Sequence, residues 1–170
     1  MRTSILPFRF RVTRWTRSGV AALLFALVAS VDSSQADSIV KGRRSLVLDG
    51  QAAQLIVDLA GGSIADFHFR SAALNPLQWE EKGPPTAPRP MGHFLCLDRW
   101  GAPSEAERKN GMPFHGEASR VEWQVAQEPV SRAGKIQAEM TAVLPLAGLK
   151  AKRRVELSST HALFVVQEEV

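Results

Sequence analysis

The chain has 170 residues, which is enough for one ordinary domain, and its 45% hydrophobic content is typical of a globular protein. Its formal net charge is +4, but residues 1–36 hold five arginines and one aspartate, so the other residues balance 16 cationic against 16 acidic side chains. That balance excludes the basic field of a nucleic-acid-binding protein, and we expect no nucleic-acid partner. With the single cysteine Cys96, no intrachain disulfide can form, and the apolar residues around it predict a buried, unreactive thiol.

The first 36 residues have the pattern of a secretory signal peptide. Basic residues precede an uncharged apolar run over 19–31, and small side chains follow at Ser34 and Ala36. The apolar run is shorter than the roughly 20 residues of a membrane span, although an uncleaved anchor is the alternative. We therefore expect a periplasmic or secreted protein, residues 37–170, with no stable membrane span after cleavage.

Two short strands and a tight turn are predicted after the leader. Residues 45–48 and 54–59 are rich in Leu and Val, as β-strands are. Asp49-Gly50 follows the first of them, and Asp-Gly favours the positive φ angles of a two-residue hairpin turn. We expect a β-hairpin here.

A third strand is predicted over residues 63–70, after a break at Gly61-Gly62. Alternation places Ala65, Phe67 and Phe69 on one side of this strand, which should be half-buried. Its other face would carry Ile64, Asp66, His68 and Arg70.

Residues 71–117 are predicted to be irregular. Five prolines between residues 76 and 90 cannot donate hydrogen bonds to a central β-ladder. Ser104 and Glu107 fit a capping box, and Asn110-Gly111 follows as a stop signal, so one short helical turn is expected. Five large apolar side chains favour an ordered, functional loop: Trp79, Phe94, Trp100, Met112 and Phe114.

Regular alternation returns in residues 121–125, 136–144, 152–157 and 163–170. Short strands separated by turns, with no convincing amphipathic helix, predict an all-β antiparallel meander in a sandwich. The last alternating pattern runs to Val170 without a turn, and a last strand without a partner would leave an exposed edge. We therefore expect the sequence to be truncated.

His115 is the strongest candidate for chemistry. It lies between Phe114 and Gly116, directly before a predicted strand, where a loop can present an imidazole at the rim of a sheet. Imidazole donates or accepts a proton near neutral pH, and Gly116 would let a substrate approach closely. The alternative is a structural histidine that hydrogen-bonds the loop backbone. Glu117 is not paired with His115, since side chains of adjacent strand positions face opposite ways.

Arg99, Trp100 and His93 are candidate substrate-binding residues. An indole can stack on the face of a sugar ring, and a guanidinium can bond the ring's hydroxyls. An Asp98–Arg99 ion pair that fixes the loop is the alternative for Arg99. His93 lies in an apolar, strand-like context and is expected in the core or at its rim. Signatures for metals, nucleotides and serine hydrolases of the α/β type are absent from the sequence, and we expect no metal and no cofactor.

The Gly-Gly-Ser-Ile run at 61–64, the long irregular segment and the Pro-Phe-His-Gly run at 113–116 together resemble the galactose mutarotase-like (aldose 1-epimerase) superfamily. The likeness runs from about residue 45 to residue 170, and points to an uncharacterised bacterial branch. It implies a large antiparallel β supersandwich, of which this chain would be the amino-terminal half. The family's usual Asn-Arg loop is missing, and Asp98-Arg99 is the candidate for its place.

The resemblance also implies a mechanism, in which a carboxylate takes the proton of the anomeric hydroxyl while a histidine protonates the ring oxygen. His115 matches the family's first, substrate-contacting histidine. The second histidine and the glutamate base come from later in the family's sequence, so the fragment alone is expected to be inactive. The leading hypothesis is a carbohydrate-binding, aldose 1-epimerase-like isomerase with a sugar or oligosaccharide as partner. A noncatalytic carbohydrate-binding module, or the β-sandwich part of a polysaccharide lyase or hydrolase, is the alternative.

Overall fold

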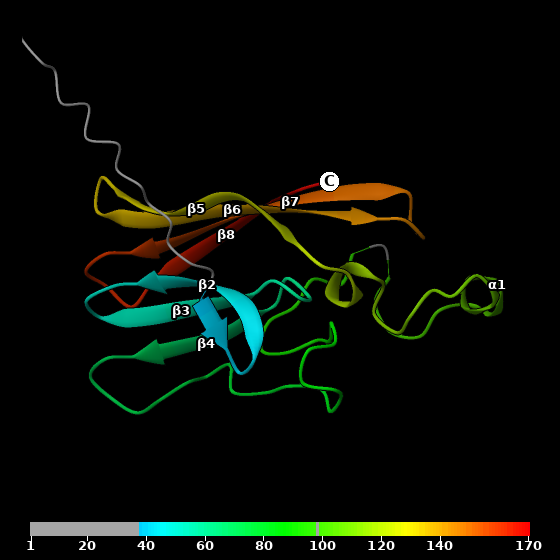
Figure 1. The fold of residues 1–170 in the computed structure, drawn as a ribbon, viewed down its shortest axis with the longest axis horizontal. Helices are drawn as coiled ribbons and strands as arrows, with labels where there is room; N and C mark the ends of the chain where they lie inside the picture. The colour runs from blue at the N-terminus through cyan, green and yellow to red at the C-terminus, as the bar shows by residue number, and fades with distance from the viewer. Residues whose placement is uncertain (1–37, 98) are drawn as a thin grey trace, which may run out of the picture. The chain divides into compact units, whose positions relative to one another are not determined.

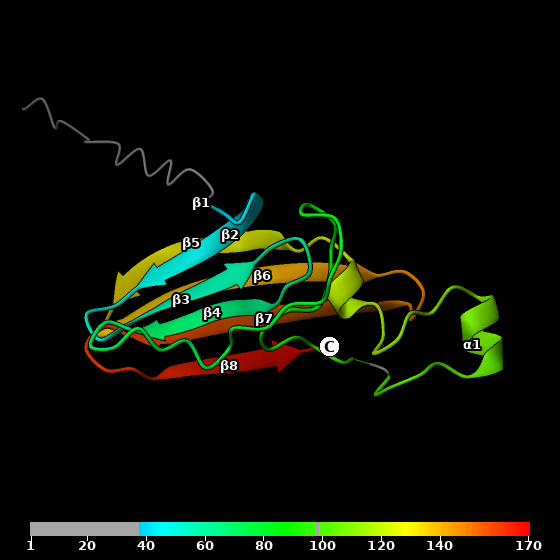
Figure 2. The ribbon, with the colours of Figure 1, turned by 90° about the horizontal axis from the view of Figure 1, so that it is seen from below.

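The computed structural model describes residues 38–97 and 99–170. The predicted signal peptide and Asp98 lie outside the described residues. Within the described part, no helix is both long and apolar enough to cross a membrane. The fold there is a β-sandwich of two four-stranded antiparallel sheets, which Figures 1 and 2 show stacked face to face, and the predicted all-β class is confirmed.

The strands of each sheet follow one another in chain order, so both sheets are meanders. The first sheet contains β1 (Ser38–Val40), β2 (Arg43–Asp49), β3 (Ala53–Asp58) and β4 (Ile64–Phe69). The second contains β5 (Gln124–Arg132), β6 (Lys135–Leu144), β7 (Leu149–Ser158) and β8 (Phe164–Glu169). A long irregular region joins the sheets and includes α1 (Glu105–Lys109) and the 3-10 turn η1 (Ala118–Arg120).

The core fills the space between the sheets. Every second residue of β6 is buried, as the apolar stripe over 136–144 predicts, and β7 follows the same alternation. Trp123, just before β5, is fully buried, and its Nε1–H donates to the Ala118 carbonyl oxygen at 2.9 Å. Each buried Leu or Val contributes roughly 1.5–3 kcal/mol to stability, so this shared core holds the sheets together.

The connection between β2 and β3 differs from the prediction. The hairpin is present, but the residues between Asp49 and Ala53 form a longer loop, and Gly50 does not adopt a positive φ. A glycine is needed there for a different reason. A Cβ atom on Gly50 would lie 2.8 Å from the Ser158 carbonyl oxygen, because the end of β7 passes close by. The expected two-residue turn was therefore wrong.

Ile64 also lies on the other face from the one predicted. The pairing of β3 with β4 shifts register between Ile56 and Val57, which is a β-bulge, and the shift turns Ile64 into the core, where it is fully buried. Beyond the bulge the prediction holds. Phe67 is buried, whereas Asp66 and His68 lie on the opposite, half-exposed face of β4.

Buried polar side chains fasten the irregular region to the sandwich. Arg43 of β2 forms a buried ion pair with Asp58 and donates to the Ala87 carbonyl oxygen at 2.7 Å. Glu117 is buried as well, and its carboxylate accepts the backbone N–H groups of Leu146 and Ala147, both at 3.0 Å, in the β6–β7 turn. Such charge-assisted bonds anchor the irregular region at two places, one in its middle and one near its end.

Candidate functional site

A projecting loop leaves the irregular region and carries α1 at its tip (Figures 1 and 2). Two hydrogen bonds close its base, which we call the neck. The backbone N–H of His115 donates to the Gly101 carbonyl oxygen at 2.9 Å, and the Gly101 N–H donates to Nδ1 of His115 at 3.0 Å. The predicted alternative role of His115, a hydrogen bond to the loop backbone, is thus present in the structure.

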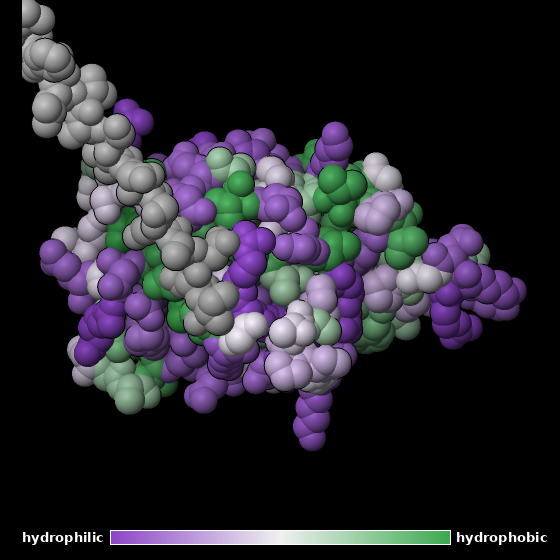
Figure 3. All heavy atoms as spheres, in the orientation of Figure 1, coloured by the Kyte–Doolittle hydropathy of each residue, from purple (hydrophilic) through white to green (hydrophobic). Residues whose placement is uncertain are grey.

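The tip of the projection is built from local signals that the sequence contains. Ser104 and Glu107 form the predicted capping box at the start of α1, and Asn110 ends the helix. Arg99 pairs with the Glu107 carboxylate. This bond and those from Ser104 lower the pKa of Glu107 to about 2. Hydrophilic side chains predominate at this tip in Figure 3.

The hydrogen bond from Gly101 also determines which imidazole nitrogen of His115 carries the proton. A nitrogen that accepts an N–H cannot itself be protonated, so the neutral ring holds its proton on Nε2. Nε2–H is therefore a hydrogen-bond donor that the neck does not use. His115 is only half-buried, which leaves its ring accessible from solvent.

The backbone of His115 is in an unusual conformation for a residue with a side chain. Its φ is 67°, in the left-handed region, inside a turn closed by the Gly116 N–H to the Pro113 carbonyl oxygen at 3.2 Å. A non-glycine residue there costs about 1 kcal/mol or more, and such positions concentrate at functional sites.

Four aromatic side chains gather near this imidazole, and we call them the aromatic cluster: Trp79, Phe94, Trp100 and Phe114. The ring centroids of Phe114, Trp100 and Phe94 lie 4.1, 5.0 and 5.6 Å from that of His115. Trp79 stacks on Phe94 at 5.9 Å. Trp100 is 82% exposed, and Trp79 and Phe114 are each 53% exposed. Trp79, Trp100 and Phe114 therefore stay out of the core, and more than half of the surface of each is open to a ligand.

Of the predicted site residues, the structure brings Trp100 to His115 and gives the other two different surroundings. Arg99 pairs with Glu107 within the projection. The alternative pair with Asp98 falls outside the described residues. His93 exchanges both backbone hydrogen bonds with Ile64, at 2.8 and 3.0 Å, and its side chain is exposed, so of the two expected places, the core or its rim, the core is ruled out. The exposed side chain follows from the strand-like pairing, which directs neighbouring residues to opposite faces.

Cys96 is half-buried, and desolvation raises the pKa of its thiol, which agrees with the predicted unreactive role. Over residues 38–97 and 99–170, no three His, Cys, Asp or Glu side chains come together as a metal site.

One side-chain pair was missed from the sequence. Nδ1 of His68 lies 2.9 Å from a carboxylate oxygen of Asp66, on the outer face of β4. Residues i and i+2 of a strand share a face, so the Asp-Phe-His run at 66–68 contained the signal for this pair.

The comparisons with known proteins give one structural likeness. No family model matches the chain, and no curated protein matches it. A solved structure described as "Crystal Structure Analysis of HI1317" is 18% identical, with a TM-score of 0.51 over 67% of this chain and 40% of that one. At this identity the likeness shows the fold alone, and this chain spans about 40% of the length of HI1317.

Proposed function

We propose that the aromatic cluster and His115 form a carbohydrate-binding site. The observation that carries the proposal is the left-handed backbone of His115, which keeps an imidazole with a free Nε2–H among exposed aromatic rings. A pyranose presents a C–H face that stacks on an aromatic ring and hydroxyls at its edge that hydrogen-bond. Trp100 supplies the ring, and His115 supplies the donor.

We further propose that the whole protein is an aldose 1-epimerase-like isomerase. In that reaction the anomeric O–H loses its proton to a base, the bond from C1 to the ring oxygen breaks, and the ring oxygen takes up a proton. Rotation about C1–C2 and reclosure give the other anomer. His115 would hold a sugar oxygen through Nε2–H, and the proton transfers would need a carboxylate and a second histidine. This chain spans 40% of the length of HI1317, so the activity is proposed for the whole protein.

A noncatalytic carbohydrate-binding module is the second candidate. Glu117, the carboxylate nearest to His115 in the sequence, is buried and bonded to the β6–β7 turn, so it does not serve as a base for a ligand at Trp100. Binding alone needs only the exposed rings and one donor. The same architecture could also serve as the β-sandwich part of a polysaccharide lyase or hydrolase.

Calorimetric titration of the full chain with methyl β-D-galactopyranoside and methyl α-D-glucopyranoside tests the site. Trp100→Ala should weaken the binding by about fivefold or more, because stacking contributes on the order of 1 kcal/mol or more. The matched control is Leu163→Ala, which also removes an exposed apolar side chain, just before β8. Equal affinity in the wild type and Trp100→Ala would refute the site.

Polarimetry with freshly dissolved α-D-glucose separates the two candidates. An isomerase in its complete form speeds the approach to the anomeric equilibrium, whereas a binding module leaves the spontaneous rate unchanged.

We also propose export to the periplasm or secretion, from the leader's composition. Recovery of the protein from the cytosolic fraction with residues 1–36 intact would contradict export.

A further inference from the structure

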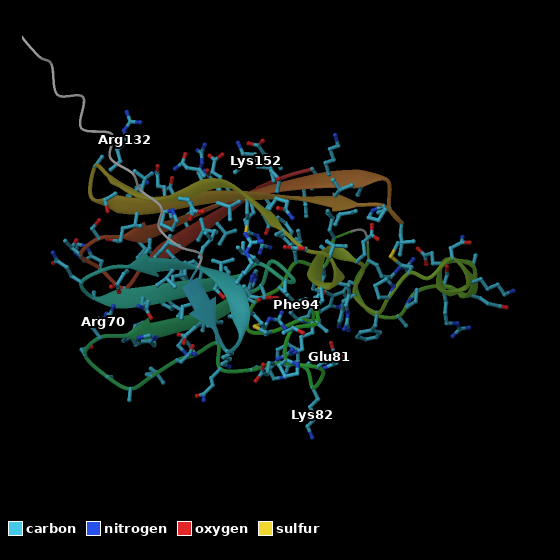
Figure 4. All side chains as sticks on the ribbon, in the orientation of Figure 1. Arg70, Glu81, Lys82, Phe94, Arg132 and Lys152 are labelled. Carbon is cyan, nitrogen blue, oxygen red and sulfur yellow. The ribbon has the colours of Figure 1, made fainter. Side chains whose placement is uncertain are left out.

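A second hollow lies on the outer face of the first sheet. It has a volume of about 530 Å³ and lies between β4, the β1–β2 turn and the segment after β4. Figure 4 shows Arg70, one of its lining residues, at one end of the sandwich and Phe94 of the aromatic cluster toward the end from which α1 projects. The polar side chains that line it are Lys41, Asp66, His68, Arg70, Asn75 and Gln78.

The Asp66–His68 pair gives this hollow an oriented imidazole. The carboxylate lies 2.9 Å from Nδ1, and because an ionised carboxylate only accepts, Nδ1 of His68 carries the proton. Nε2 of the neutral ring is then an acceptor, which is the opposite of the arrangement at His115. The two side chains are 28% and 32% exposed, so the pair is held by the sheet and still open to a ligand.

Asn75 supplies oriented donors in the same hollow. Its side-chain oxygen accepts the backbone N–H groups of Leu77 at 2.9 Å and Phe67 at 3.3 Å. These two bonds identify the oxygen, so the NH₂ group is the end that remains for a ligand. Leu74, which is half-exposed, contributes an apolar wall.

The cations that line the hollow are paired. Arg70 is paired with Asp49, and Lys41 has Glu80 at 3.7 Å. Since each cation has a carboxylate partner, the hollow offers no excess positive charge to a phosphate or carboxylate group. It offers donors and acceptors side by side, which matches hydroxyl groups, because each hydroxyl donates one hydrogen bond and accepts others.

We infer that this hollow is a second ligand site, for an uncharged polyhydroxylated molecule such as a sugar unit, in which Nε2 of His68 accepts a hydrogen bond from a ligand hydroxyl. Three observations support this inference. They are the hydrogen bond between Asp66 and His68, the orientation of the Asn75 amide, and the carboxylate partners of Lys41 and Arg70. This inference does not depend on the proposed site at His115 and can be refuted separately.

Long-range ¹H–¹⁵N NMR of the full chain, labelled at histidine nitrogen and held above pH 8, tests the inference, because this spectrum reports the proton position on each imidazole. We expect His68 protonated on Nδ1 and His115 on Nε2 before any ligand is added. Methyl β-D-galactopyranoside or methyl α-D-glucopyranoside should then shift the His68 Nε2 resonance, and Trp100→Ala should leave that shift unchanged.

His68→Gln should weaken this binding event by about tenfold, as expected for the loss of one hydrogen bond. His161→Asn, in the exposed β7–β8 turn, is the matched control and should have no effect. The inference is overturned if neither sugar shifts His68 in the folded wild-type protein, if inorganic phosphate shifts it and the sugars do not, or if His68 carries its proton on Nε2.

Discussion

At the residue scale, His115 combines a structural and a proposed binding role on different atoms. Nδ1 closes the neck with Gly101, whereas Nε2–H is left for a ligand. The sequence could identify His115 through its neighbours Phe114 and Gly116. It could not reveal the bond to Gly101, which lies 14 positions away in an irregular segment where no periodicity relates the two residues.

His115→Asn separates the two roles. Asn tolerates the left-handed region and its side-chain oxygen can accept the Gly101 N–H, but it has no group in the place of Nε2. We expect the free energy of unfolding to change by about 1 kcal/mol or less, while the affinity for methyl β-D-galactopyranoside falls about tenfold. Urea denaturation and calorimetry measure the two quantities. A large loss of stability with unchanged affinity would assign His115 a structural role alone.

Glu107 makes the projection sensitive to acid. Its folded-state pKa of about 2 lies below the ordinary 4.5, so its contribution to stability is complete above pH 4.5 and is lost as the pH falls toward 2. Carboxyl ¹³C shifts followed over this range should show the late titration. Glu107→Gln should raise amide exchange at the start of α1, whereas Glu105→Gln, which loses only an exposed pair with Lys109, should not. A Glu107 titration near 4.5 would contradict the Arg99 bond.

At the element scale, the strands with one buried face were predictable and the tertiary adjustments were not. The stripe over 136–144 became β6 because alternation alone specifies which face meets the core. The capping box predicted α1 from local chemistry. The bulge that buries Ile64 and the close approach of β7 to Gly50 depend on distant partners, and neither leaves a local pattern.

The Gly61-Gly62 break is explained by such a distant partner. A Cβ atom on Gly62 would collide with the buried indole of Trp123, and its φ of +64° is also unfavourable for other residues. Gly134 has a φ of +76°, and a Cβ atom there would meet nothing within 4 Å, so Gly134→Ala carries the backbone strain alone. We expect Gly62→Ala to reduce stability by about 1–3 kcal/mol more than Gly134→Ala. If thermal or urea unfolding showed the same loss of stability for both variants, the Trp123 indole would have moved aside without destabilising the fold.

At the scale of the whole molecule, the sandwich supports two surfaces that we propose as ligand sites, one mainly aromatic and one mainly polar. The aromatic cluster lies in the irregular region that joins the two sheets. Hydrogen bonds from Arg43 and to Glu117 anchor this region to the sandwich. The hollow with His68 lies on the outer face of β4. Loops positioned by a rigid scaffold are the usual location of binding residues, and the likeness to HI1317 concerns that scaffold.

The most direct test of the proposed binding site is an NMR titration of the full chain with methyl β-D-galactopyranoside, followed at the indole N–H resonances. Trp123 is buried and bonded to Ala118, so it serves as an internal reference. The account predicts that the Trp100 resonance shifts with saturation while that of Trp123 stays in place. A saturable shift at neither Trp100 nor Trp79, or equal shifts at all three, would contradict a carbohydrate site at the aromatic cluster.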